Sequence, residues 1–208
     1  GKKTAAVITD MDQPLGYAVG NSLEVLEAID TLEGHGPADF TEVVFALGAQ
    51  MLLLAGKASD EADARAQMQR VIEDGSAKKK FAEFVAAQGG DASYVYDKEK
   101  LPVAEKQLAV TSEADGYVDR ILAENIGIAC MTLGGGRETK ESTIDLSVGI
   151  ILKKKNGDAV KRGDTLAVIY GNDPAKMEAA RQKIQNAYEI GSAPKAQEPV
   201  VRKYIFSE

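Results

Sequence analysis

The sequence has 208 residues, of which 44% are hydrophobic, 27% are charged and 6% are aromatic. This composition is typical of a globular protein and excludes collagen-like, disordered and disulfide-scaffold proteins. The chain carries 25 Lys and Arg against 32 Asp and Glu, which gives a net charge of −7. A net acidic chain argues against a nucleic-acid partner, because general nucleic-acid binders need a basic face. No run approaches 18 consecutive apolar residues, so a membrane partner is not expected either.

The residue types most often used in catalysis are scarce. The single cysteine, Cys130, cannot form an internal disulfide, which indicates a reducing compartment and predicts a cytoplasmic protein. Cys130 lies among apolar residues, and we expect a small buried thiol there. The only histidine, His35, lies in a loop that ends a helix, where we expect no general base. The sequence has no paired cysteines, no histidine cluster and no Gly-x-Ser-x-Gly, so neither a zinc site nor an elbow-type hydrolase is supported.

The first half of the chain predicts one strand and four helices. Residues 4–9 form a short apolar run typical of a buried strand, and residues 10–21 form a loop. The helices are expected to start at residues 21, 39, 59 and 76, each ended by a glycine. One strand cannot make a sheet, because its backbone groups need partners. Together with a start at Gly-Lys-Lys-Thr without Met, this predicts that the chain is cut from a longer protein whose preceding residues supply the sheet.

The second half changes to short alternating strands. A polar linker over residues 91–102 divides the chain into expected domains 1–101 and 102–208. Strands are expected over residues 106–111, 116–122, 143–152, 165–170 and 200–206, and helices over residues 124–133 and 174–190. The expected fold class is therefore α/β, or α+β for a fragment. It consists of an incomplete, mostly helical α/β domain followed by an α/β hammerhead-like domain.

Residues 149–171 carry the clearest local pattern. Two Gly-Asp turns alternate with Val160, Leu166 and Ile169, which should point inward. This spacing is typical of half of a biotinyl- or lipoyl-type barrel-sandwich, and residues 116–118 resemble the start of the other half. A carrier would need an acylatable lysine on the hairpin after the last strand, but Tyr-Gly-Asn-Asp-Pro follows Ile169. A domain that packs and closes is favoured over a carrier, and a non-catalytic packing or interaction module stays open as the alternative to an enzyme.

Three polar segments have weaker patterns. Gly134-Gly135-Gly136-Arg137 could bind an anion through backbone amides and a guanidinium, but a closure loop is the favoured interpretation. Residues 153–155 (Lys-Lys-Lys) are expected to form a solvated tip. The loop over residues 10–27 should expose backbone carbonyls close to one helical carboxylate. Such oxygens suit a hard, weakly charged cation.

Five motifs, in family order, resemble the pyrimidine-nucleoside phosphorylase / thymidine phosphorylase family, closest to its bacterial pyrimidine-nucleoside branch. They are ITDMDQPLGYAVGNSLEV at 8–25, AAQGGD at 86–91, ADGYV at 114–118, LGGGR at 133–137 and IDLSVG at 144–149. The resemblance implies a glycosyltransferase of nucleotide salvage, with a pyrimidine nucleoside and phosphate as substrates. Phosphate would attack C1′ reversibly and release the base and a (deoxy)ribose 1-phosphate.

The resemblance also implies what the chain lacks and what it holds. The family's phosphate- and base-binding residues precede the ITDM segment, so no catalytic residue is assigned and the chain alone should be inactive. The helical domain with the dimer interface is also absent, so a homodimer is expected for the intact enzyme and a monomer for the fragment. One potassium site is implied in the intact enzyme, with ligands from the carbonyls of Leu15 and Ala18 and the carboxylate of Glu27. The other ligands lie outside the chain, so the ion should bind weakly or not at all in the fragment.

Overall fold

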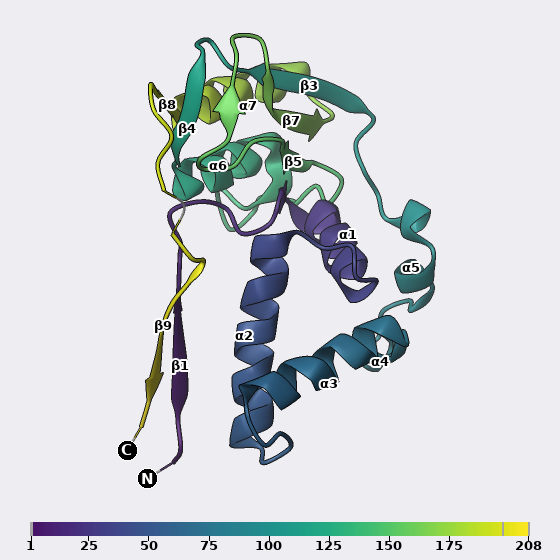
Figure 1. The fold of residues 1–208 in the computed structure, drawn as a ribbon. Helices are drawn as coiled ribbons and strands as arrows, with labels where there is room; N and C mark the ends of the chain where they lie inside the picture. Colours follow the sequence, from purple (N-terminus) through teal and green to yellow (C-terminus); the bar gives the residue numbers. More distant parts are fainter. Residues whose placement is uncertain (1, 197, 208) are drawn as a thin grey trace. The chain divides into compact units, whose positions relative to one another are not determined.

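The computed structural model describes residues 2–196 and 198–207, which divide into two compact units (Figure 1). Unit 1 takes in the chain up to Asp10, Ala28–Lys98 and the chain from Pro199. Unit 2 takes in Met11–Glu27 and Glu99–Glu198. The division between Lys98 and Glu99 lies near the expected boundary at residue 101. Two segments fall outside the expected division, because Met11–Glu27 belongs to unit 2 and the chain from Pro199 belongs to unit 1. The assignment of domains 1–101 and 102–208 stays a prediction.

A two-stranded antiparallel ribbon joins the two ends of the chain in unit 1 (Figure 1). Strand β1 (Ala5–Thr9) pairs with β9 (Val201–Phe206), with Ala5 opposite Phe206. Strand β1 therefore has one partner within this chain, the last strand β9, which its sequence did not predict. The N–H and C=O groups of a strand can pair with any other strand in register. The local sequence of β1 therefore does not indicate that its partner lies at the other end of the chain.

The helices of unit 1 follow the glycine-ended pattern expected from the sequence. They are α1 (Asn21–Leu32), whose second half belongs to this unit, α2 (Ala38–Leu54), α3 (Glu61–Glu73) and α4 (Ser76–Ala87). Two short turns, α5 (Ser93–Tyr96) and the 3₁₀ turn η1 (Lys98–Lys100), lie in the expected linker. Helices α2 and α3 pack through small side chains, with Ala46, Ala49 and Ala64 fully buried.

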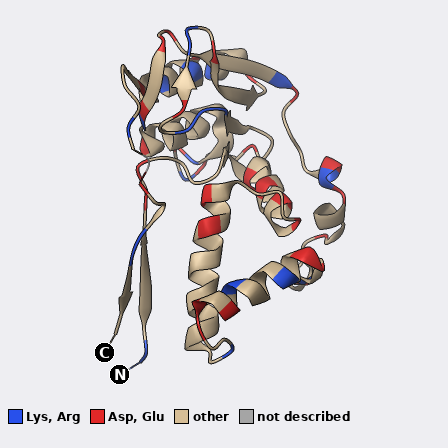
Figure 2. Cartoon of the chain, in the orientation of Figure 1, with Lys and Arg blue, Asp and Glu red and all other residues tan. Residues whose placement is uncertain are grey.

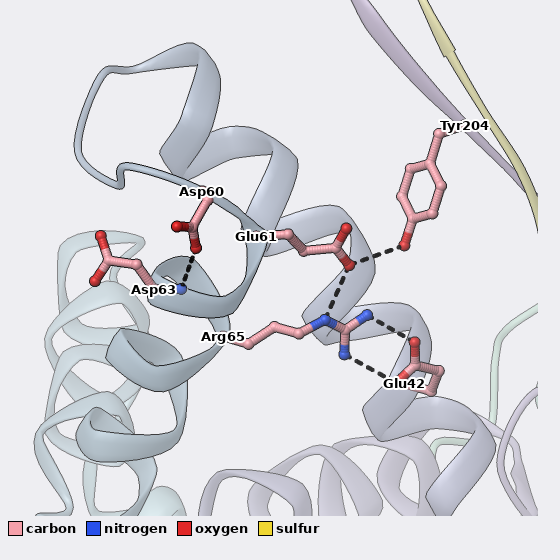
Figure 3. A network of polar contacts seen from close by, with 6 residues as sticks. All are labelled: Glu42, Asp60, Glu61, Asp63, Arg65 and Tyr204. Carbon is pink, nitrogen blue, oxygen red and sulfur yellow. Dashed lines mark hydrogen bonds and ion pairs between the residues drawn. The ribbon is translucent and has the colours of Figure 1, made fainter.

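An arginine links α2 to α3. The Arg65 guanidinium donates to both carboxylate oxygens of Glu42, at 3.0 and 2.7 Å, and its Nε donates to Glu61 at 3.0 Å (Figure 3). The Tyr204 hydroxyl of β9 lies 3.4 Å from the same Glu61 carboxylate. Asp60 caps α3 by accepting from Asp63 N at 2.9 Å. Helix α3 carries both acidic and basic residues (Figure 2), with Glu61 and Asp63 in its first turn and Arg70 in its last.

Unit 2 is built from two antiparallel sheets and two longer helices. The four-stranded sheet has the order β2 (Ala18–Val19), β5 (Gly149–Leu152), β7 (Thr165–Gly171) and β3 (Lys106–Thr111). The three-stranded sheet has the order β6 (Ala159–Val160), β4 (Gly116–Ile121) and β8 (Tyr188–Gly191). Helices α6 (Ala123–Cys130) and α7 (Pro174–Ala187) pack on each other. No helix in the described part of the chain has the length and apolar character needed to cross a membrane.

One continuous core fills unit 2. Val160, Leu166 and Ile169 are buried, as the alternating pattern predicts, and they join side chains from α6 and α7. Ile126 of α6 and Ile184 of α7 are fully buried in the same cluster. The expected α/β mixture is confirmed, with its strands paired antiparallel.

Two elements of unit 2 differ from expectation. The helix expected to reach residue 190 ends at Ala187, and β8 follows because it pairs with β4. The buried Tyr188 hydroxyl donates to Lys154 O at 3.0 Å and to Leu166 O at 3.1 Å, which fixes the change of direction, and burial raises the pKa of Tyr188. The strand expected over residues 143–152 begins only at Gly149.

Candidate functional site

The predicted potassium ligands lie on one loop of unit 2 and on the helix that follows it. The loop leads into the short strand β2, whose Ala18 and Val19 pair with Ile151 and Ile150 of β5. Gly16 within the loop has φ of +70°, a left-handed conformation that favours glycine. Pairing with β5 and the glycine turn together hold the loop beside the start of α1.

The Glu27 carboxylate of α1 is seated against this loop. One oxygen, Oε1, accepts hydrogen bonds from Tyr17 N at 2.9 Å and from Ala18 N at 3.0 Å. The other, Oε2, faces Gly16 so closely that a Cβ there would lie 2.1 Å from it. A Cβ at residue 16 would therefore displace the Glu27 carboxylate, which is held against the loop by its hydrogen bonds to Tyr17 N and Ala18 N.

The backbone around Ala18 has two different partners. Tyr17 O accepts from Leu152 N at 2.8 Å, which ties the loop to the end of β5. Tyr17 N and Ala18 N both donate to Glu27 Oε1, so the carboxylate lies against the backbone of Ala18, one of the predicted ligand residues.

The chemistry of these groups fits part of a potassium shell. Backbone carbonyls with one carboxylate are the oxygen donors that replace the water of a large monovalent cation. Among the described residues, no group of three or more His, Cys, Asp or Glu could hold a metal ion through side chains alone. Leu15, Ala18 and Glu27 would supply three donors, fewer than such a cation takes, so further ligands would have to complete the shell.

Lys155 contacts the same loop, contrary to the expectation of a solvated tip for residues 153–155. Its ammonium donates to the carbonyl of Pro14 and, at 2.7 Å, to that of Gly16. The ammonium also lies over the Tyr17 ring, 5.6 Å from its centroid. Lys154 instead donates to Ala159 O at 2.8 Å, and only Lys153 is exposed. Lys155 was misread because its partners lie about 140 residues away in the sequence.

The glycine-rich segment at residues 134–137 is hydrogen-bonded to other segments of unit 2. Gly134 O accepts from Asp145 N at 2.9 Å, and Gly135 O accepts from the Asn21 side chain at 2.9 Å. Arg137 is exposed. Two carbonyls of the segment are thus tied to the fold, and a closure role for it stays a prediction, because an anion would use its N–H groups.

A polar cluster beside this loop was not found from the sequence. Asp145 Oδ1 accepts from the Ser147 hydroxyl at 2.6 Å and from Ser147 N at 2.9 Å, and Asp145 Oδ2 accepts from Asn172 at 2.8 Å. The Ser147 hydroxyl, followed by its backbone N–H and Asn172, lowers the pKa of Asp145 against the opposing effect of burial. The Asp-x-Ser spacing is the local signal of this turn. This turn lies before β5, in the region where the sequence predicted strand from residue 143.

The remaining reactive groups behave as expected. Cys130 is buried, with Sγ 3.7 Å from Val19 O, and burial followed by the charge of Glu24 raises the pKa of this thiol to about 11. A thiol with so high a pKa is a poor nucleophile. His35 is exposed in the loop after α1, where its backbone N–H donates to Asp30 O at 2.8 Å. Cys130 therefore lies against Val19, the residue after the predicted ligand Ala18.

Comparison with known proteins matches two parts of the chain to two family models. Residues 117–191 match the family described as "Pyrimidine nucleoside phosphorylase C-terminal domain", and residues 1–78 match "Glycosyl transferase family, a/b domain". The chain is 52% identical over 194 residues to a pyrimidine-nucleoside phosphorylase of Geobacillus stearothermophilus, covering 93% of this chain and 45% of the relative. It is 52% and 51% identical over 172 residues to proteins of the same name from Bacillus subtilis and Staphylococcus haemolyticus, covering 83% of this chain and 40% of each relative. The chain thus spans less than half the length of these curated relatives.

Proposed function

The chain belongs to the pyrimidine-nucleoside phosphorylase family, and from this premise we propose that the full-length protein containing it catalyses the reversible phosphorolysis of pyrimidine nucleosides. The observation that carries the proposal is the 52% identity to a pyrimidine-nucleoside phosphorylase over 93% of the chain. A phosphate oxygen would form a bond to C1′ while the C1′–N bond breaks. The base leaves with that electron pair and takes up a proton, and the other product is a pentose 1-phosphate.

Within this reaction we assign no catalytic residue to the 208-residue chain. The chain would instead contribute ligands that bind a cation. The Leu15 and Ala18 carbonyls and the Glu27 carboxylate would bind potassium, together with ligands from residues outside the chain. When bound, potassium would supply a positive charge that neutralises Glu27 and fixes the loop. The hydrogen bonds from Tyr17 N and Ala18 N to Glu27 support this assignment, because they bring the carboxylate to the loop.

The mostly helical unit 1 would serve as part of the enzyme's α/β domain. Helix α2 leaves an apolar stripe of Leu47, Met51 and Leu54 exposed, at the spacing of one helix face. Together with the length of the relatives, this stripe supports packing against further residues of the full-length protein. A homodimer and a cytoplasmic location remain predictions for that protein.

The alternative is a non-catalytic packing module. The self-contained core of unit 2 favours it, because such a domain needs no further residues to close. The two proposals differ in what the full-length protein does with a nucleoside.

The test is an assay of the full-length protein with uridine or thymidine, with and without phosphate. Base release followed by ultraviolet absorbance should require phosphate, and ³¹P NMR should show one pentose 1-phosphate for each base released. The 208-residue chain alone should release none. Base release without phosphate would indicate a hydrolase, no release at all would favour the packing module, and turnover by the chain alone would show that the active site is misplaced.

A further inference from the structure

We propose that Lys155 is the positioning residue of the cation site, and that its ammonium orders the loop from which the Leu15 and Ala18 carbonyls would bind potassium. This inference rests on the proposed function, since it concerns the same loop. It adds a residue that contributes no ligand and lies far from the others in the sequence. It also explains why a lysine in a Gly-Asp turn region is directed into a loop of backbone carbonyls.

The contacts of Lys155 hold both residues that flank Leu15. The ammonium donates to the carbonyls of Pro14 and Gly16, the latter at 2.7 Å, so one side chain fixes the backbone on either side of a predicted ligand. Hydrogen bonds from an ammonium to carbonyls are charge-assisted and stronger than neutral ones. Lys155 is half-buried, which limits competition from water.

The backbone around Lys155 is itself anchored. Lys155 N donates to the Asp158 carboxylate at 2.7 Å, which closes the turn from which the side chain extends. Asn156 N donates to the Gln13 side chain at 3.2 Å, which fastens the turn to the loop a second time. The backbone from which the Lys155 side chain extends is therefore held in place by hydrogen bonds.

Lys155 and Glu27 hold adjacent parts of the loop with opposite charges. The Lys155 ammonium donates to the carbonyls of residues 14 and 16, while the Glu27 carboxylate accepts from the N–H groups of residues 17 and 18. Each charged group thus binds the backbone groups of complementary polarity. With both in place, the loop would be ordered before the ion arrives, and the ion would not have to supply that ordering free energy.

A second effect of Lys155 opposes the first. A positive side chain near a cation site repels the ion, so removal of the charge alone would strengthen potassium binding. The proposal requires the ordering effect to be the larger one. The sign of the change in affinity on removing the ammonium therefore decides between the two effects.

The experiment uses the full-length protein and three variants, Lys155→Met, Lys155→Arg and Lys154→Met. Binding of K⁺ is measured by the shift in thermal midpoint against a choline background, and binding of Tl⁺ as a K⁺ substitute by ²⁰⁵Tl NMR. Lys155→Met should weaken both at least tenfold, while kcat at saturating K⁺ stays within twofold of wild type. Lys155→Arg should recover most of the affinity, because a guanidinium can donate to two carbonyls.

Lys154→Met is the matched control, because it removes the same charge from the neighbouring residue. The Lys154 ammonium donates to Ala159 O, whereas the Lys155 ammonium donates to the carbonyls of Pro14 and Gly16. It should leave the affinity for K⁺ within twofold. An unchanged or tighter affinity in Lys155→Met, or equal weakening in both Met variants, would overturn the role of Lys155. If the wild-type protein binds neither K⁺ nor Tl⁺, the proposed cation site fails and Lys155 fails with it. Phosphorolysis itself would be judged separately by the uridine assay.

Discussion

The two units of the chain are stabilised in different ways. Among the described residues, the large side chains that are fully buried lie in unit 2, with the exceptions of Ile29 and Val95. The core of unit 2 is one cluster of branched side chains from two sheets and two helices. In unit 1 four of the eight buried hydrophobic residues are alanines, and larger apolar groups such as Met51 and Phe84 stay exposed.

Ion pairs add to the small core of unit 1. Lys98 contacts Asp30 at 2.6 Å and Glu33 at 2.8 Å, and Lys78 contacts the other oxygen of Glu33. With Arg65 and its two carboxylates (Figure 3), these pairs join helices α1 to α4 and the following turn. Partly exposed pairs contribute little free energy each, whereas buried apolar side chains contribute several times more. Unit 1 should therefore open at lower denaturant than unit 2.

Truncation in the core of unit 2 should have the largest effect. Ile169 is fully buried in β7, and Ile169→Ala should lower the free energy of unfolding by about 2–5 kcal/mol, because it removes buried methyl groups and leaves a cavity. Met51 of α2 is 67% exposed, and Met51→Ala should change it by less than about 0.5 kcal/mol. Urea unfolding of both variants checks this. Equal losses of unfolding free energy in Ile169→Ala and Met51→Ala would contradict the contrast between the two units.

Removal of the arginine link should have the next largest effect. Arg65→Met keeps the length of the side chain but loses the bidentate pair with Glu42 and the bond to Glu61. Unit 1 should lose about 1–2 kcal/mol, since the pair is bidentate and Arg65 is only partly exposed. Amide hydrogen exchange should speed up in α2 and α3 and stay unchanged in β5 and β7. Faster exchange in β5 and β7 as well would mean that the two units unfold together.

The smallest predicted effect is a dependence of unit 1 on pH. Hydrogen bonds from Lys78 and then Lys98 lower the pKa of Glu33 from 4.5 to about 2. A pKa lowered in the folded state gives stability that is present above pH 4.5 and is lost as the pH falls toward 2. About 1 kcal/mol should be lost, because these groups are partly exposed.

The measurement is urea unfolding between pH 2 and pH 6, followed by the amide signals of α4. Glu33→Gln should remove most of the pH dependence in this window, because the variant carries no titrating group at residue 33. Glu83→Gln is the control, since Glu83 is an exposed carboxylate of α4 that forms an ion pair with the exposed Lys80. A wild-type profile that is flat from pH 5 to pH 2 would contradict the role of Glu33.

Local patterns predicted the elements well, and long-range pairs account for what was missed. Glycine stops and apolar spacing were enough for the helices of unit 1, and alternation was enough for the inward face of β7. The pairing of β1 with β9 and the contact of Lys155 with the loop at residues 14–16 join segments more than 130 residues apart. Such contacts depend on tertiary packing, which leaves no periodic signal. The ligand set at Leu15, Ala18 and Glu27 came from family resemblance, and the residues alone indicated only oxygen donors.

The most direct test of the proposed cation site is a potassium titration of the full-length protein with uridine and phosphate. Activity and thermal midpoint should rise saturably with K⁺ and not with choline. Glu27→Gln, which keeps an oxygen to accept from Tyr17 N but removes the charge, should raise the half-saturating K⁺ at least tenfold. Glu24→Gln alters a carboxylate of the same helix that accepts from Gly20 N, and it should leave the half-saturating K⁺ unchanged. The same K⁺ dependence in Glu27→Gln as in wild type would contradict the account.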